Sequence, residues 1–372
     1  MEFSTAKQKS THVVPVICID KLEKHPNADT LCVVKINDFS CCVKTDLWKE
    51  GDLAAWIPPD SIVDIKRPEF SSLDKPRIRA KKIRQIVSYG FLVPAPKGLS
   101  VGDNAAEILG VTHYDPIEEE IKSEGKSKKN KSIYIEQESS PAGTYPTYDV
   151  DNMLSIGRKV FKEGELVSVT EKIHGENTRV VFSNGQLFVG SRNIWKKRFH
   201  VLKYSKQELL DRGMSEDVVC SIIENVGKKE NKWWEAVNNY PGIIEFCRTY
   251  PNHCVYGELY GSVKGMKYGS TGQNYFAAFD ILKPDGRFMD PGEFQFVCGS
   301  FDIPTAFFMG LYKFNMEELI KLASGKTNIN NANHIREGIV VKPVQERWDE
   351  KYGRVCCKVV SPEYYEGDYN AF

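Results

Sequence analysis

A single lysine at the end of a strand-like run is the feature that most constrains this chain of 372 residues. Residues 165–170 (Glu-Leu-Val-Ser-Val-Thr) alternate apolar and polar side chains with the period of a half-buried β-strand, and Lys172 follows almost directly. Gly175 then allows a tight turn. A lysine amine attacks other groups only when it is deprotonated, so neighbouring cations, a metal ion or desolvation must lower its pKa. The alternative is a solvated surface lysine, which is the commoner situation for an isolated lysine.

Five short polar segments follow Lys172 along the chain. They are 191–193 (Ser-Arg-Asn), 256–258 (Tyr-Gly-Glu), 279–281 (Phe-Asp-Ile), 337–342 (Glu-Gly-Ile-Val-Val-Lys) and 357–360 (Cys-Lys-Val-Val). Together with Lys-x-His-Gly-x-Asn at 172–177, this ordered series resembles the motifs of the covalent nucleotidyltransferases, the superfamily of ATP-dependent ligases and mRNA capping enzymes. Histidine at position 174, where DNA ligases and capping enzymes usually carry aspartate, is similar to RNA ligases. The resemblance is strongest to RNA ligases of the Deinococcus and Naegleria type, which place an OB module before the nucleotidyltransferase domain.

The N-terminal third of the sequence predicts a small β-barrel or β-sandwich. Residues 13–109 are short apolar runs broken by turn residues, with little helical periodicity. The His-Pro-Asn-Ala-Asp turn at 25–29, the run at 51–57 and the run at 88–94 resemble OB-fold modules of the tRNA-binding kind. Within this region a basic strip is expected to grip RNA phosphates, and its alternative is the charged solvent face of a strand. The strip consists of Arg77, Arg79, Lys81, Lys82 and Arg84.

The whole chain is therefore expected to be α+β, with an OB-like β-barrel followed by an antiparallel-sheet nucleotidyltransferase domain that carries helices. The predicted domains are an OB-fold RNA-binding module at 1–114, a charged linker at 115–147 and the ligase domain at 148–372. The linker is predicted from blocks of acidic, Lys/Ser/Gly-rich and turn-forming residues. Apolar residues at helical spacing predict helices within 204–239.

Composition limits the location of the protein and its partners. Fifty Lys and Arg residues balance fifty Asp and Glu residues, so a nucleic-acid binder of this kind must concentrate its cations locally. The ten cysteines include no C-x-x-C pair and are expected to be reduced thiols. The N-terminus lacks the apolar segment of a signal peptide, and no apolar run reaches the ~20 residues of a membrane span. We expect an intracellular protein, cytoplasmic or nuclear, that is neither secreted nor inserted in a membrane; no oligomer is predicted.

The resemblance implies a role for each candidate residue. Lys172 would attack the α-phosphorus of ATP and become lysyl-AMP, and the catalytic set is Lys172, Glu337, Lys342 and Lys358. Mg²⁺ or Mn²⁺ would be held by Glu258 and Glu337, with His174 as a further candidate whose alternative is a structural hydrogen bond. The residues expected to contact ATP are Glu171, Lys172, Asn177, Arg192, Glu258, Phe279, Lys342 and Lys358.

The resemblance also assigns finer tasks among these residues. Glu258 would contact the ribose, Arg192 the ribose or a phosphate, and Lys342 and Lys358 the α-phosphate. Phe279 would stack on adenine, with Phe276 as a second candidate and core packing as the alternative for both. Glu171 would meet the adenine edge, and Asn177 and Asp280 would assist sealing. Many relatives carry Lys-x-Lys where this chain has Cys356 and Lys358, so one cation is missing.

The function implied is an ATP-dependent RNA ligase that joins a 3′-OH end to a 5′-phosphate end of RNA. Two other functions remain open at this point. One is a GTP-dependent mRNA capping guanylyltransferase, and the other is a non-catalytic RNA-binding protein with a tRNA-binding-like barrel.

Overall fold

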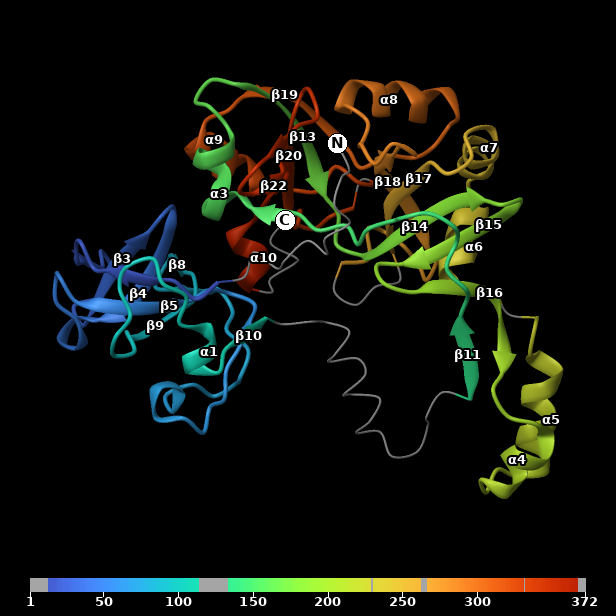
Figure 1. The fold of residues 1–372 in the computed structure, drawn as a ribbon, viewed down its shortest axis with the longest axis horizontal. Coiled ribbons are helices and arrows are strands. Elements are labelled where there is room, and N and C mark those ends of the chain that lie inside the picture. The colour runs from blue at the N-terminus through green and yellow to red at the C-terminus, as the bar shows by residue number, and fades with distance from the viewer. Residues whose placement is uncertain (1–12, 114–132, 229, 262–265, 331, 367–372) are drawn as a thin grey trace.

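The computed structural model describes residues 13–113, 133–228, 230–261, 266–330 and 332–366 (Figure 1). In Figure 1 the N-terminal residues, in blue, form a small barrel at one side, and the later residues build two larger sheets with helices packed on them. This arrangement is the expected α+β architecture.

The barrel consists of short antiparallel strands. One sheet has the order β1 (Val16–Cys18), β5 (Leu53–Ile57), β9 (Phe91–Pro94), and another the order β2 (Glu23–Lys24), β3 (Leu31–Ile36), β4 (Phe39–Lys44). Two strand pairs complete it: β7 (Lys81–Ile83) with β8 (Ile86–Ser88), and β6 (Ser61–Ile62) with β10 (Thr112–His113). The helical segments are η1 (Thr45–Leu47), η2 (Pro68–Phe70) and α1 (Ala106–Leu109). The backbone N–H of Tyr89 donates to the carbonyl of Ser40 at 2.8 Å, which ties the end of β8 to β4 and helps to close the barrel.

The first large sheet has five strands in the order β12 (Asp151–Asn152), β23 (Cys357–Val360), β20 (Gly338–Pro343), β13 (Leu166–Lys172), β19 (Phe308–Lys313). All its pairs are antiparallel except β12 with β23. One face is apolar and forms a common core with α3 (Met153–Val160) and α9 (Met316–Ala323). A small antiparallel pair, β21 (Trp348–Asp349) and β22 (Gly353–Arg354), lies between β20 and β23 in the sequence.

Strand register brings three of the expected catalytic residues to the opposite face of this sheet. Lys172 pairs with Gly338, Ser168 pairs with Lys342, and Val340 pairs with Lys358. Side chains alternate between faces along each strand, so Lys172, Lys342 and Lys358 all project from the same side. We call this side the lysine face. Residues that are odd-numbered in these strands, such as Val169 and Val341, turn to the apolar core.

The second large sheet has six strands in the order β11 (Tyr134–Gln137), β16 (Trp195–Leu202), β15 (Gln186–Ser191), β14 (Glu176–Ser183), β17 (Cys254–Tyr260), β18 (Tyr275–Leu282). One face packs on α6 (Lys232–Asn238), α7 (Pro241–Thr249) and α8 (Pro291–Ser300). The other face carries Asn177 directly opposite Glu258. The predicted helical segment at 204–239 is confirmed as α4 (Lys206–Asp211), α5 (Glu216–Asn225) and α6, and Figure 1 shows α4 and α5 projecting from the body of the domain.

The predicted linker is shorter at its C-terminal end than expected. Residues 115–132 of it lie outside the described residues, whereas Tyr134–Gln137 forms β11 and pairs with β16. The strand is stabilised by an ion pair of 3.1 Å between Glu136 and Lys196 and by packing of the Tyr134 ring near His200. The sequence prediction of a linker was based on the charged blocks earlier in this segment, so it missed the short alternating run that forms β11.

The barrel and the two-sheet domain are joined by direct contacts. Arg158 of α3 donates to Asp38 of the barrel at 2.9 Å. The C-terminal helix α10 (Pro362–Glu366) packs near β7, and the ring centroid of Tyr365 lies 5.8 Å from that of Tyr89. The barrel therefore contacts α10, which follows β23 of the five-stranded sheet.

Replacing Phe276 tests the core of the six-stranded sheet. This ring is fully buried against Gly257, where an added Cβ would lie 2.2 Å from it. Phe276→Ala is expected to lower the free energy of unfolding by about 3–5 kcal/mol because the ring leaves a cavity. Phe296→Ala on α8, where the side chain is 77% exposed, is the control and should change it by less than about 0.5 kcal/mol. Denaturant unfolding measures both, and equal values for the two variants would contradict the packing.

Candidate active site

Lys172 lies at the end of β13 and is ion-paired with Glu337. Its Nζ donates to Glu337 Oε1 at 2.8 Å, and the lysine side chain is 24% exposed. Burial lowers the pKa of Lys172, but the carboxylates of Glu337 and Glu258 outweigh it and raise the pKa above its ordinary value. In this state the amine is therefore protonated. The sequence predicts that neighbouring cations lower the pKa of Lys172. The charged group bonded to Lys172 is instead the carboxylate of Glu337.

Gly175 is required next to Lys172 for a reason that differs from the expected turn. A Cβ at this position would lie 2.2 Å from the carbonyl oxygen of Leu259 in β17. Only glycine lets the chain after Lys172 pass this close to the six-stranded sheet. The chain that follows β13 of the five-stranded sheet therefore passes close to Glu258.

Lys358 lies close enough to Lys172 for their charges to interact. Burial lowers the pKa of Lys358, and the charge of Lys172 lowers it further. The two ammonium groups thus repel each other on the lysine face, as expected for a pair that would share a phosphate.

Two carboxylates near Lys172 suit a divalent cation. Burial raises the pKa of Glu258 to about 8, and the charge of Glu337 adds to this rise although Lys172 opposes it. Glu337 is buried, and among the described residues no donor reaches its Oε2. The buried Oε2 of Glu337 is unpaired, and the carboxyl group of Glu258 keeps its proton. A cation bound by these two side chains would satisfy both.

The part of the chain that the structure describes holds no group of three or more His, Cys, Asp or Glu side chains with metal-site geometry. Mg²⁺ in nucleotide sites is commonly bound through one or two carboxylates together with phosphate oxygens. Glu258 and Glu337 fit that pattern.

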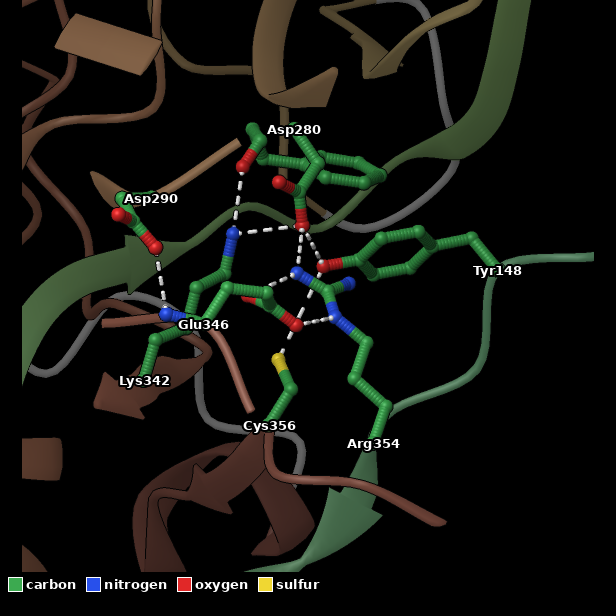
Figure 2. Close-up of polar contacts among 8 residues, drawn as sticks. Tyr148, Asp280, Asp290, Lys342, Glu346, Arg354 and Cys356 are labelled. Carbon is green, nitrogen blue, oxygen red and sulfur yellow. Dashed lines mark hydrogen bonds and ion pairs between the residues drawn. The ribbon is translucent and has the colours of Figure 1, made fainter. Parts of the chain in front are cut away.

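Lys342 makes its contacts with Asp280. Its Nζ donates to Asp280 Oδ2 at 2.7 Å and to the carbonyl oxygen of Phe279 at 2.8 Å (Figure 2). The lysine is only 8% exposed. It joins the lysine face to the six-stranded sheet.

Arg192 and Asn177 stand on the six-stranded side of the site. Arg192 forms an ion pair with Asp149, and its positive charge opposes the rise in the pKa of Glu258. Asn177 lies opposite Glu258, and no donor among the described residues reaches its buried Oδ1. An unused acceptor in this position is available to a bound hydroxyl or amino group.

Glu171 and His174, on either side of the motif lysine, are engaged with other parts of the chain. The carboxylate of Glu171 is buried and accepts hydrogen bonds from the Thr327 hydroxyl and from the backbone N–H of Asn328, the latter at 2.9 Å. His174 Nδ1 lies 2.8 Å from the hydroxyl of Tyr364 in α10, and its backbone N–H donates to the Tyr268 hydroxyl at 2.7 Å. For His174 these contacts match the structural alternative, a hydrogen bond.

The two aromatic candidates for adenine stacking are placed differently. Phe279 is partly buried, with its ring centroid 4.6 Å from that of Tyr148. Phe276 is fully buried in the core beneath the helices of the six-stranded sheet, so this second candidate is wrong as a base platform.

The basic strip is only partly a strand. Ile78 and Ala80 are buried in the barrel, whereas Arg79, Lys81 and Lys82 are exposed. Arg77 pairs with Asp60 at 2.7 Å, and Arg84 forms the turn between β7 and β8, where its Nη1 donates to the carbonyl of Asn27 at 3.1 Å. Strand β7, which carries Lys81 and Lys82, lies close to α10.

Sequence reasoning missed several residues that shape the site. Tyr148 and Arg354 bind Asp280, and Thr327 and Asn328 bind Glu171. None of them belongs to a recognisable motif, and only the folded chain brings them together. Two surface hollows, of about 620 and 430 Å³, lie along α6 and α7, and neither is lined by a predicted site residue.

A domain of two sheets, with three lysines on one face and an adjacent pair of glutamates, defines a nucleotidyltransferase-like site. The RNA ligase family profile matches residues 165–360, more than half of the chain, and an OB-fold domain profile matches residues 13–95. The chain belongs to the RNA ligase family. No curated protein sequence matches it significantly.

Solved structures of a Naegleria gruberi RNA ligase have a similar fold. An apo mutant has 21% sequence identity and a TM-score of 0.68, with 95% of this chain and 98% of that chain covered. A mutant of that ligase solved with ATP and Mn gives 20% identity and a TM-score of 0.68 at the same coverage. The ligase solved with PPi gives 20% identity, a TM-score of 0.67 and again the same coverage. At this identity the likeness shows the fold, including the barrel ahead of the two-sheet domain.

All ten cysteines are unpaired in the structure, as expected from their spacing. Within the described ranges, none of the helices is both long and apolar enough to cross a lipid bilayer.

The raised pKa of Glu258 predicts a pH-dependent stability. The folded protein keeps this proton up to about pH 8, whereas the unfolded chain releases it near 4.5. Unfolding then releases a proton, so the contribution of Glu258 to stability is present at low pH and is lost as the pH rises to about 8. Glu258→Gln cannot titrate, so its stability relative to the parent protein should rise between about pH 5 and pH 9.

Denaturant unfolding at several pH values measures this difference. Glu224→Gln, on the exposed surface of α5, is the matched control. A difference for Glu258→Gln that does not change with pH would show that Glu258 is ionised in the folded protein.

Proposed function

We propose that this protein is an ATP-dependent RNA ligase that seals 3′-OH and 5′-phosphate ends through a lysyl-AMP and an RNA-adenylate. The observation that carries the proposal is the ion pair of Lys172 with Glu337 at 2.8 Å, on a face shared with Lys342 and Lys358. Membership of the RNA ligase family supports it. We further propose that the protein acts within the cell on broken RNA.

The proposed substrates of the first half-reaction are ATP and a divalent cation, Mg²⁺ or Mn²⁺. The Naegleria relative was solved with ATP and Mn, and with AMP and Mn. Glu337 and Glu258 would hold the cation, which would neutralise phosphate charge and compete with the ammonium of Lys172 for the carboxylates. The unused Oε2 of Glu337 supports this assignment.

In the first step Lys172 must lose the proton that Glu337 and Glu258 stabilise. The charge of Lys358 favours that loss, since two cations on one face repel. The lone pair of Nζ then forms a bond to the α-phosphorus of ATP, and the bond from that phosphorus to the bridging oxygen breaks to release pyrophosphate. Lys342 and Lys358 stabilise the charge on the α-phosphate oxygens.

In the second step the 5′-phosphate of RNA displaces Lys172 from the α-phosphorus, and AMP becomes attached to the RNA end. In the third step the 3′-OH attacks that 5′-phosphorus, a phosphodiester bond forms, and AMP leaves. Asn177 and Asp280 are proposed to assist these sealing steps. Glu171, Arg192 and Phe279 are proposed to contact the nucleotide.

The division of labour between the domains is also part of the proposal. Residues 1–114 would form an RNA-binding OB module and residues 148–372 the ligase domain, with part of 115–147 as linker. The basic strip would contact the RNA backbone near α10.

Removing the nucleophile tests the chemistry. Lys172→Ala is expected to abolish transfer of label from α-³²P-ATP to the protein, since no other amine occupies that place on β13. RNA affinity should stay near that of the parent protein because the basic strip is intact. Labelled protein is detected on a denaturing gel with Mn²⁺ or Mg²⁺ present. Label retained by Lys172→Ala would mean that another residue is the nucleophile.

The same gel separates this function from its competitors. Labelling of the parent protein by GTP but not by ATP would favour a guanylyltransferase. Labelling by neither nucleotide, with RNA binding intact, would favour a non-catalytic RNA-binding protein.

Charge reversal tests the basic strip. Arg79→Glu with Lys81→Glu is expected to weaken RNA binding and to reduce the slope of log affinity against log salt by about one for each phosphate that the strip no longer binds. Lys97→Glu, also exposed on the barrel, is the control. Filter binding over a salt series measures both, and identical slopes for the two variants would remove the strip from the interface.

A further inference from the structure

A buried polar cluster joins the two large sheets beside the proposed site. Asp280, 1% exposed, receives three donors on one oxygen, Oδ2. They are Lys342 Nζ at 2.7 Å, Arg354 Nη2 at 2.7 Å and the Tyr148 hydroxyl at 2.5 Å (Figure 2). Tyr148 is a donor here because burial raises its pKa well above the ordinary value.

Arg354 is held in this cluster through its Nε and Nη2, whereas no acceptor among the described residues reaches its buried Nη1. It stands on β22 and is 8% exposed. Its Nε donates to Glu346 Oε1 at 2.6 Å and its Nη2 to Glu346 Oε2 at 3.0 Å. The guanidinium carbon lies 3.6 Å from the ring centroid of Phe288. A buried arginine held in this way has a fixed position and a fixed charge.

The charges of the cluster cancel only when Arg354 is present. Lys342 and Arg354 supply two positive charges, and Asp280 and Glu346 supply two negative charges. Burial raises the pKa of Asp280, but Arg354 and Lys342 outweigh it and hold the pKa below its ordinary value. Without Arg354 the cluster would carry a net negative charge, and Asp280 would cancel the charge of Lys342 toward an approaching phosphate.

Cys356 marks where a second cation is missing from the last motif. It lies two residues before Lys358, and its Sγ is 3.8 Å from the hydroxyl of Tyr148, so its side chain faces the cluster. A hydrogen bond of 3.0 Å from the backbone N–H of Cys356 to the carbonyl of Arg354 folds the chain tightly here. That turn lets Arg354 contact Asp280 while Cys356 contacts Tyr148, which is itself bonded to Asp280.

We propose that Arg354 is a positioning residue that cancels the charge of Asp280 in place of a cation at position 356, so that Lys342 keeps its positive charge for a nucleotide phosphate. This inference rests on the proposed function, because that function gives Lys342 its phosphate. It assigns to Arg354 no contact with substrate. The requirement is for a positive charge beside Asp280, supplied from β22 in this chain.

Moving the charge from 354 to 356 tests the proposal. The rate of lysyl-AMP formation is measured against ATP concentration for Arg354→Met, for Arg354→Met with Cys356→Lys, and for Arg354→Met with Cys356→Met as the neutral control. Arg354→Met is expected to raise the KM for ATP and to lower kcat/KM on the order of tenfold or more. The lysine at 356 should recover most of this loss, and the neutral control should recover none.

Each outcome decides the matter. Labelling by Arg354→Met that equals the parent protein, or equal labelling by the lysine and neutral double variants, overturns the proposal. If Arg354→Met does not fold, Arg354→Lys is compared with Arg354→Gln, and equal labelling of these two overturns it. Absence of labelling in the parent protein would instead be a failure of the proposed function.

Discussion

The ion pair between Lys172 and Glu337 depends on the pairing of β13 with β20, and the rest of the site is arranged around it. The pairing places Lys172 opposite Gly338, directly after Glu337. A Cβ on Gly338 would lie 2.0 Å from the carbonyl oxygen of Val359, so the glycine lets β23 approach with Lys358. One contact thus fixes an amine, a carboxylate and a second cation on a rigid sheet, where a site keeps its geometry best.

Lys172, the proposed nucleophile, is in the wrong protonation state for attack in this structure. Glu337 and Glu258 favour its ammonium form, and the charge of Lys172 in turn lowers the pKa of Lys358. A bound cation would change that balance, because it would take over the carboxylates. This coupling would link reactivity at Lys172 to the arrival of the metal and nucleotide, and it would protect the amine at other times.

Much of this could be predicted from sequence because it depends on local periodicity. Alternation located β13, and the motif segments at 256–258 and 337–342 fall in β17 and along β20, so the lysines and glutamates of the motifs were found. Contacts between distant segments were not predictable. Thr327 and Asn328 donate hydrogen bonds to the carboxylate of Glu171. Tyr364 forms a hydrogen bond with His174, and Arg354 donates one to Asp280. Each of these partners lies in an irregular stretch or in an element too short to show a periodic pattern. Strand β11 was missed for a related reason, since four residues carry too little alternation to stand out from charged neighbours.

Lys172 is proposed to become the covalent carrier of AMP. The most direct test is peptide mapping by mass spectrometry after the parent protein has been incubated with ATP and Mn²⁺ and quenched under conditions that preserve a phosphoramidate. We expect one AMP per chain, on the peptide that contains Lys172 and on that side chain. AMP on any other residue, or a protein that binds ATP without forming an adduct, would overturn the proposed role of Lys172.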